Sequence, residues 1–340
     1  MTALGTTQVR TIRWGILGTG RIAKAFATAL KDTPDAVLAA VASRSVDSAT
    51  AFATEYGSHE LTKSHGSYQA LADDPDVDAI YIATPHPMHH ENALMCLNGG
   101  KAILVEKAFT VNLREAEEIV ALARSKNLFA MEAMWTRFHP SLLEAKRIIA
   151  SGEIGTIATI QADLGFYSDA GPEHRLFNPA LGGGSLLDLG IYPLSIAAYF
   201  LGPVQSVKAS GQLGPTGVDV QAGFVLTHEN GGLSSCSSSL LARTPVEFTI
   251  CGSQGFIRLH NRFHNTEDLT VELNDGSRRT VNKPRIGNGY AHEIIEVNRC
   301  LREGLLESPV MPLDETLALM GVLDEMRKQI GVTYDADRAA

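Results

Sequence analysis

One short stretch near the start, from Thr11 to Leu30, constrains the fold of this chain most. Residues 12–17 have the apolar pattern of a buried strand, and Gly18-Thr19-Gly20 joins them to a helical run from Ile22 to Leu30. Gly18 permits a tight turn, Gly20 lets the backbone approach a pyrophosphate, and the first N–H groups of the helix face the anion. The stretch predicts a dinucleotide-binding unit. The alternative is an ordinary turn, because glycines also mark turns that bind nothing.

Charge and composition argue against several classes of partner. The net charge is −9 and no long basic block occurs, which argues against a nucleic-acid or anionic membrane surface. The first ten residues lack an apolar leader, and we expect no later run long enough to span a bilayer. No C-x-x-C spacing occurs, so we expect neither a disulfide framework nor a zinc site, and we predict a cytoplasmic enzyme. The four cysteines are Cys96, Cys236, Cys251 and Cys300.

The second predicted strand, Ala36 to Ala42, ends in residues that bear on the choice of cofactor. In the dinucleotide-binding fingerprint, an acidic residue at this corner bonds the ribose 2′-hydroxyl. Here the corner reads Ser43-Arg44-Ser45, without a carboxylate. An arginine and two hydroxyls suit a 2′-phosphate, which an aspartate would repel. NADP(H) is therefore predicted over NAD(H). The alternative is that Arg44 is a solvated surface residue.

A third predicted strand, Ala79 to Pro85, is followed by three histidines, His86, His89 and His90. Such a trio invites a metal site, but no carboxylate or cysteine partner has ligand spacing, so no metal is predicted. Imidazoles at the carboxyl end of a parallel strand are better explained as neighbours of a nicotinamide.

The next strand, Ala102 to Val105, carries Glu106 and Lys107 at its carboxyl end. Open α/β sheets bind ligands at this edge. From the pattern alone, Lys107 is either a surface residue or a site residue. A helix (Leu113 to Lys126) and a last strand (Leu128 to Glu132) follow. Because strand and helix alternate throughout, residues 1–133 are predicted to form a Rossmann domain with a doubly wound parallel sheet.

From residue 134 to 340 the pattern changes to successive strands, several joined by hairpin signals such as Asn230-Gly231 and Asp275-Gly276. This half is predicted to be an α+β domain with a large, open, mostly antiparallel sheet that binds substrate. Alternation leaves Ser235, Ser237 and Ser239 on one face. Such a face suits either a homodimer contact or plain solvent exposure.

One helical segment, Leu181 to Gly202, interrupts these strands. Asp188 and Tyr192 stand at i and i+4 within it, which places them on one helix face. A core helix with a capping aspartate is the alternative. Asp188 lies too far inside the segment to be a cap, which favours a functional site.

Five segments occur in an order and spacing that point to one enzyme family. On these residues the chain resembles the glucose-fructose oxidoreductase/inositol dehydrogenase (Gfo/Idh/MocA) superfamily. Within it, the chain is most similar to the branch of dimeric dihydrodiol dehydrogenases and NADP-linked D-xylose dehydrogenases. The resemblance covers almost the whole chain. The segments are WGILGTGRIA, ILVEKAF, MEAMWTRF, GGGSLLDLGIYPL and ESPVMPLDETL.

The resemblance implies roles for individual residues. Lys107 matches the lysine that lies between the nicotinamide and the substrate hydroxyl in this superfamily, although Ala108 replaces the proline that usually follows it. Tyr192 stands where the dihydrodiol branch carries tyrosine, and Asp188 matches the aspartate one turn earlier. Arg175 resembles a basic residue that reaches toward cofactor or substrate. The predicted cofactor contacts are Gly18, Thr19, Gly20, Arg21, Ile22, Ser43, Arg44, Thr84, His86, His89, Glu106, Lys107, Trp135, Arg137 and Arg175.

The resemblance also implies a reaction, hydride transfer between NADP(H) and a hydroxyl or carbonyl carbon of a sugar, polyol or trans-dihydrodiol. A neighbouring Lys107 ammonium would lower the pKa of the Tyr192 hydroxyl. We therefore expect Tyr192 to exchange the proton, Lys107 to polarise the oxygen and Asp188 to orient both, with the first two roles open to exchange.

Three alternatives to this reaction remain open. The first two are a keto-sugar (anhydrofructose-type) reductase and a sugar–sugar oxidoreductase with tightly held cofactor. The third is a non-catalytic, dinucleotide-binding sugar sensor. A homodimer through the C-terminal sheet, or a higher oligomer, is also expected.

Overall fold

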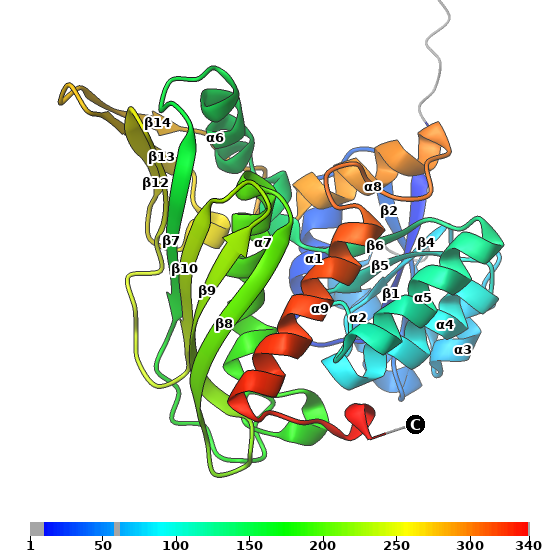
Figure 1. The fold of residues 1–340 in the computed structure, drawn as a ribbon. Helices are drawn as coiled ribbons and strands as arrows, with labels where there is room; N and C mark the ends of the chain where they lie inside the picture. The colour runs from blue at the N-terminus through cyan, green and yellow to red at the C-terminus, as the bar shows by residue number, and fades with distance from the viewer. Residues whose placement is uncertain (1–9, 58–61, 339–340) are drawn as a thin grey trace, which may run out of the picture.

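Two sheets lie side by side in the computed structural model of this chain, with helices around and between them (Figure 1). The structure describes residues 10–57 and 62–338. We expect no apolar leader in the first ten residues. Most of these residues lie outside the described part of the chain. The arrangement confirms the predicted α/β class, with a Rossmann sheet and a larger, mostly antiparallel sheet.

The first sheet has six parallel strands in the order β3-β2-β1-β4-β5-β6, which confirms the doubly wound prediction. Its central strands are buried on both faces, as parallel strands between two helical layers must be. The strand order reverses between β1 and β4, and ligands bind at such a switch point. The strands are β1 (Ile12–Leu17), β2 (Ala36–Ala42), β3 (Lys63–His65), β4 (Ala79–Ile82), β5 (Ala102–Glu106) and β6 (Ala130–Ala133).

The short edge strand β3 was not expected from the sequence. Its three residues, Lys63, Ser64 and His65, carry no apolar pattern, and only backbone pairing with Ala40–Ala42 of β2 makes it a strand. The helices of this half confirm the alternation of strand and helix. They are α1 (Arg21–Lys31), α2 (Val46–Tyr56), α3 (Tyr68–Ala72), α4 (His89–Asn98) and α5 (Leu113–Lys126).

The second sheet has eight strands in the order β14-β13-β12-β11-β7-β10-β9-β8. Only the pair β7 and β10 is parallel, so the predicted mostly antiparallel sheet is confirmed. Ser235 is exposed and Ser237 is half-buried, whereas Ser239 is buried, so the predicted polar face does not extend to the end of its strand. The strands are β7 (Ile157–Gly165), β8 (Val204–Leu213), β9 (Asp219–His228), β10 (Leu233–Ser239), β11 (Phe248–Gly252), β12 (Gly255–Leu259), β13 (Asp268–Leu273) and β14 (Arg278–Asn282).

The predicted helical segment is built from three kinds of turn. A 3-10 turn, Pro179–Leu181, is followed by a π-helical turn, Leu186–Gly190, and by α7, Ile191–Leu201. The stretch Pro179–Leu201 is long and apolar enough to cross a membrane, which corrects our expectation that no such run exists. However, 89% of its apolar window is buried inside the protein. It is a core segment beneath the inner face of the second sheet.

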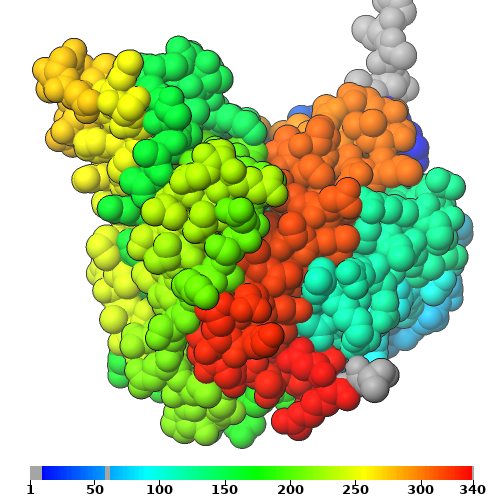
Figure 2. All heavy atoms as spheres, viewed as in Figure 1, coloured from blue at the N-terminus to red at the C-terminus, as the bar shows by residue number. Residues whose placement is uncertain are grey.

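Two C-terminal helices, α8 (Ala291–Glu303) and α9 (Leu313–Ile330), pack against the first half of the chain, and α9 also reaches the second sheet. Trp14 of β1 donates its indole N–H to Asn298 of α8 across 3.0 Å. The helix α9 lies between α5 and β8, and its orange-to-red atoms fill the space between the two halves (Figure 2). The domain boundary at 133/134 stays a prediction. The helix α9, which this boundary assigns to the second domain, contacts β6 of the first sheet and β8 of the second.

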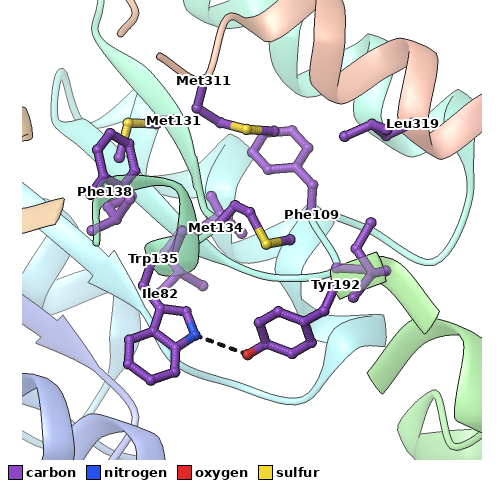
Figure 3. Close-up of a cluster of buried hydrophobic side chains, with 14 of the residues drawn as sticks. Ile82, Phe109, Met131, Met134, Trp135, Phe138, Tyr192, Met311 and Leu319 are labelled. Carbon is purple, nitrogen blue, oxygen red and sulfur yellow. Dashed lines mark hydrogen bonds between the residues drawn. The ribbon is translucent and has the colours of Figure 1, made fainter. Parts of the chain in front are cut away.

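One continuous apolar core serves both halves. Close to the junction, Met131 of β6 and Leu319 of α9 pack with Phe109, Trp135 and Tyr192 (Figure 3). Trp135 and Phe138 belong to a 3-10 turn that leads into α6 (Pro140–Ala150). The chain crosses between the two sheets here, so residues far apart in the sequence meet at this point.

Candidate active site

A cleft of about 890 Å³ opens at the carboxyl edge of the first sheet and is closed by loops of the second. Clefts of this size hold small molecules and cofactors. The structure brings most of the predicted site residues to it. Those that line the cleft are Gly20, Arg21, Ile22, Thr84, His86, His89, Glu106, Lys107, Trp135, Arg175, Asp188 and Tyr192.

The glycine turn fits a dinucleotide. Gly18 has φ +104°, and a side chain there would meet the carbonyl of Ala83. Gly20 begins α1 with no side-chain cap, and nothing lies within 4 Å of where its Cβ would be. The first N–H groups of α1 therefore face an open cradle that suits a pyrophosphate. Gly18 and Thr19 hold this turn without lining the cleft itself.

The predicted 2′-phosphate corner lies beside this turn. The backbone N–H of Gly18 donates to the carbonyl of Ala42, the last residue of β2, across 2.9 Å. Ser43 is half-buried and Arg44 is exposed. Neither lines the cleft, but both follow β2 at the sheet edge where the ribose of a dinucleotide would lie.

Lys107 leaves the end of β5 and crosses to the second half of the chain. Its ammonium donates to the backbone carbonyl of Asp188 at 2.8 Å and to the carboxylate of the same residue at 3.2 Å. Both side chains are only 11% exposed. The Lys107–Ala108 peptide bond is cis. With alanine in place of the usual proline, the lysine still points into the cleft.

The carbonyl of Asp188 is available to Lys107 because of the local helix. In a π-helical turn the donor for a carbonyl lies five residues on. For Asp188 that residue is Pro193, which has no N–H. Sequence spacing predicts Asp188 and Tyr192 on one face of an α-helix. The structure corrects this, since Asp188 lies in the π-helical turn and Tyr192 in α7.

The charges around Asp188 hold it ionised. Arg175 makes a forked contact, with two nitrogens each 3.2 Å from a carboxylate oxygen. Burial favours the neutral acid, but the charges of Lys107 and Arg175 outweigh it and hold the pKa of Asp188 well below its usual range. Burial also favours a neutral amine on Lys107. There the ionised form of Tyr192, together with Asp188 and Glu106, raises the lysine pKa instead. These charges therefore favour the ammonium form of Lys107 at neutral pH.

Tyr192 receives its hydrogen bond from a residue that sequence analysis assigned to the cofactor. The indole N–H of Trp135 donates to the Tyr192 hydroxyl across 2.9 Å (Figure 3). The Lys107 ammonium lies 4.8 Å from the centre of the tyrosine ring. Burial raises the pKa of Tyr192, while Lys107 and Trp135 act to lower it. Lys107 and Tyr192 are thus neighbours as expected, but the ammonium faces the tyrosine ring. The hydrogen bond to the tyrosine hydroxyl comes from Trp135.

The two buried histidines hold the backbone around Lys107. His86 places one ring nitrogen 3.1 Å from the carbonyl of Gly182 and the other 3.2 Å from that of Lys107. His89 lies against the carbonyls of Thr84, Ala108 and Phe109. Burial lowers the pKa of His89 to about 3, so its ring is neutral. Both rings line the cleft, as predicted, but their nitrogens serve the protein backbone.

Arg137 does not reach the cleft, which corrects its assignment to the cofactor. It is fully buried. Its guanidinium donates to the hydroxyl and carbonyl of Ser195, to the carbonyl of Val310 and to the carboxylate of Glu315. Because these acceptors occupy its donors, Arg137 ties α7 to the C-terminal segment.

The third histidine of the trio, His90, turns away to pair with Glu118 at 2.8 Å. Within residues 10–57 and 62–338, no cluster of three or more His, Cys, Asp or Glu side chains could hold a metal.

Several residues of the cleft were missed by sequence analysis. They lie in loops between strands of the second sheet and before α8, where no apolar period marks them. For the arginine, asparagine and histidine residues among them, polar character is the one signal that could have drawn attention to them. The missed residues include Phe166, Arg243, Val246, Asn261, Arg262, His264, Asn288 and Tyr290.

Two family models match this chain. Residues 12–134 match the Gfo/Idh/MocA oxidoreductase family with an NAD-binding Rossmann fold. Residues 142–258 match a C-terminal domain of the same family.

Named relatives and solved structures agree with these matches. The chain is 37% identical to trans-1,2-dihydrobenzene-1,2-diol dehydrogenase of Mus musculus over 96% of this chain and 99% of that one. The enzyme of that name from Bos taurus is 36% identical over the same shares.

Among solved structures, the NADP complex of KijD10, a 3-ketoreductase from Actinomadura kijaniata, has a TM-score of 0.80 at 25% identity, over 94% of this chain and 98% of that one. An aldose-aldose oxidoreductase from Caulobacter crescentus, at 23% identity and a TM-score of 0.85 over 94% and 97%, shares the fold. The chain therefore belongs to the Gfo/Idh/MocA family of oxidoreductases, with an NAD-binding Rossmann domain followed by the family's C-terminal domain.

Proposed function

We propose that this protein is an NADP(H)-dependent dehydrogenase or reductase that acts on a hydroxyl or carbonyl carbon of a trans-dihydrodiol, sugar or polyol. One observation carries the proposal. Lys107 from the first half meets Asp188 and Tyr192 from the second half in a cleft that begins at the glycine turn. The dehydrogenase relatives named above favour an enzyme over a sensor that binds without turnover.

Bound NADP(H) would supply or accept the hydride. The N-terminus of α1 and Gly20 would hold its pyrophosphate, and Ser43 and Arg44 would face its 2′-phosphate. Support for NADP(H) over NAD(H) comes from the arginine at that corner and from the NADP bound by the related 3-ketoreductase.

The protein residues divide the proton chemistry between them. Lys107 remains an ammonium because its pKa is raised, so it polarises the substrate oxygen as a cation and does not act as the base. Tyr192 is the group that exchanges the hydroxyl proton, with Trp135 donating to its oxygen. Asp188 holds the ammonium and balances its charge, and Arg175 in turn holds the carboxylate of Asp188.

A second candidate is reduction of a keto-sugar. At neutral pH, Lys107 and Tyr192 both carry protons, because the pKa of each is raised. Two proton donors beside one oxygen suit a carbonyl that is being reduced. The related KijD10 is named a 3-ketoreductase, which supports the same direction.

A coupled assay tests both candidates. Absorbance of NADPH is followed with trans-dihydrodiols, pentoses, hexoses and inositols in the oxidative direction, and with keto-sugars in the reductive one, each also with NAD(H). We expect turnover with NADP(H) that exceeds turnover with NAD(H). Lys107→Met and Tyr192→Phe should each lower kcat by about a hundredfold to ten-thousandfold.

Tyr199→Phe is the matched control, because Tyr199 lies on the same helix outside the cleft. It should keep wild-type turnover. Near-wild-type rates in both Lys107→Met and Tyr192→Phe would show that the reaction site is elsewhere. Cofactor affinity, measured separately by fluorescence titration, separates a loss of binding from a loss of chemistry.

We further propose a homodimer formed through the outer face of the second sheet, which is turned away from the first sheet (Figure 1). Val225 of β9 is 45% exposed and Leu233 of β10 is 47% exposed on this face, beside the exposed Ser235. A cytoplasmic location remains a prediction. Its support is the four free cysteines, and imaging of a fluorescent fusion would test it.

A further inference from the structure

Two arginines, Arg243 and Arg262, line the cleft on the wall formed by the second sheet. Both are exposed. Across the described ranges 10–57 and 62–338, neither side chain has a salt-bridge partner within 4.0 Å or a hydrogen bond. Two guanidinium groups thus face the cleft with their donors open to a ligand.

The acidic side chains that line the cleft already have partners within the protein. Among the described lining residues these are Glu106 and Asp188. Asp188 is bound by Lys107 and Arg175. Glu106 accepts a hydrogen bond from Tyr81 within the first domain. The positive charge on the second wall is therefore uncompensated, in a chain whose net charge is −9.

The loops that carry these arginines adopt unusual backbone conformations. Val246 has φ +58° and Arg262 has φ +62°, and both line the cleft. Left-handed backbone is rare for non-glycine residues, above all for a β-branched one, and such conformations gather at ligand sites. The third described non-glycine residue of this kind, Asn127, ends α5 as an ordinary helix cap.

Hydrogen bonds fix the two loops to each other and to the second sheet. The N–H of Phe263 donates to the carbonyl of Val246 at 3.2 Å, and the side chain of Asn261 donates to the carbonyl of Pro245 at 2.6 Å. Asp163 of β7 accepts from the N–H of Val246 at 2.7 Å. The two loops that carry the arginines are therefore held in place by hydrogen bonds.

The same loops touch the reacting end of the cleft. The ring of His264 lies 5.3 Å from that of Tyr192, centre to centre. Its carbonyl accepts from the hydroxyl of Thr136 at 2.9 Å, next to Trp135. Arg262 is two residues away, in the same loop between β12 and β13. This position belongs to the part of the substrate beyond its reacting carbon.

We propose that Arg243 and Arg262 bind an anionic group of the substrate, a carboxylate or a phosphate, so that the enzyme acts on an acidic sugar, polyol or diol. The inference rests on the proposed function only in taking this cleft as the substrate site. Guanidinium groups suit carboxylate and phosphate because their planar donors match two oxygens at once.

A binding experiment tests this without turnover. The NADPH-loaded protein is titrated with D-gluconate, sorbitol 6-phosphate and sorbitol at one fixed ionic strength, and binding is followed by calorimetry. The three are alcohols, so NADPH does not react with them. We expect one or both anions to bind at least about tenfold more tightly than sorbitol. Their ranking distinguishes a carboxylate from a phosphate.

The variant Arg243→Gln/Arg262→Gln should lose this preference and keep its affinity for sorbitol and NADPH. Arg278→Gln, on β14 outside the cleft, is the matched control and should keep the preference. Equal affinities of wild type for the three ligands would overturn the inference. So would a loss of NADPH affinity in the double variant, which would assign the arginines to the cofactor. The proposed function fails on a different result, absence of turnover across the substrate panel when acidic sugars and sugar phosphates are added to it.

Discussion

At the scale of single residues, the chemistry depends on how a buried tyrosine is held. The Tyr192 hydroxyl accepts from Trp135, and Lys107 lies beside the ring without touching the hydroxyl. Burial opposes a tyrosinate, so each donor or cation near Tyr192 brings its pKa closer to neutral. Trp135 also stacks on Tyr290 at 4.2 Å and 3°. Its ring is thus fixed independently of its N–H.

The variant Trp135→Phe should preserve this stack and remove the hydrogen bond. Without the donor, the tyrosinate is less stable and the pKa of Tyr192 rises further. The limb of the oxidative pH profile that reports loss of the Tyr192 proton should move to higher pH, by up to about one unit.

The profile is measured as kcat against pH with saturating cofactor. Phe138→Leu, a change in the same 3-10 turn that leaves the Trp135–Tyr192 bond in place, should leave the profile unmoved. An unmoved profile in Trp135→Phe would exclude the indole N–H from control of the proton.

At the scale of elements, the π-helical turn that carries Asp188 is capped from the second sheet. Asp219 of β9 accepts from the backbone N–H of Leu186 and from the hydroxyl of Ser185, each at 2.7 Å. Asp219 is fully buried and its other carboxylate oxygen has no partner within the described residues. Burial raises its pKa from 3.8 to about 6.

The raised pKa of Asp219 makes the free energy of unfolding depend on pH. The folded protein holds the Asp219 proton up to a higher pH than the unfolded chain does. The free energy of unfolding that this group contributes is therefore greatest below about pH 4, and it falls as the pH rises toward 6. Asp219→Asn keeps an acceptor for Leu186 and Ser185 but cannot ionise.

The stability of Asp219→Asn relative to wild type should therefore rise by about 2 kcal/mol between pH 4.5 and pH 7.5. Urea unfolding of both proteins at the two pH values measures it. A difference that stays constant with pH would show that Asp219 ionises as freely in the folded protein as in the unfolded chain.

At the scale of the whole molecule, the open face of the second sheet predicts association. Its exposed apolar residues Val225 and Leu233 lie on neighbouring strands, in positions that point to the same side. Light scattering should give a mass of twice the 36.5 kDa of one chain. Val225→Asp with Leu233→Asp should reduce it to that of one chain, because buried carboxylates oppose the contact.

Leu143→Asp is the control, since Leu143 is equally exposed on α6, away from this face. It should leave the mass unchanged. A wild-type mass of one chain would rule out the dimer at the concentration measured.

The difference between local sequence patterns and contacts across the whole molecule explains which features could be predicted from the sequence. Local pattern determines the strand-turn-helix at Gly18 and Gly20, the alternation that makes the parallel sheet and the hairpins of the second sheet. These depend on residues near each other in the chain, whose spacing and backbone preferences act locally. The edge strand Lys63–His65 was missed because backbone pairing alone makes it a strand.

The sequence by itself determined the two sheets, the dinucleotide turn and, through family resemblance, the identities of Lys107, Asp188 and Tyr192. Only the tertiary structure decided what those residues contact. Arg137 is buried in the core, where it donates to Ser195. Trp135 donates to the Tyr192 hydroxyl, and Lys107 donates to the backbone carbonyl of Asp188. The physical reason is that hydrogen bonds and charges act over a few ångströms in space, whereas their partners lie tens of residues apart in the chain.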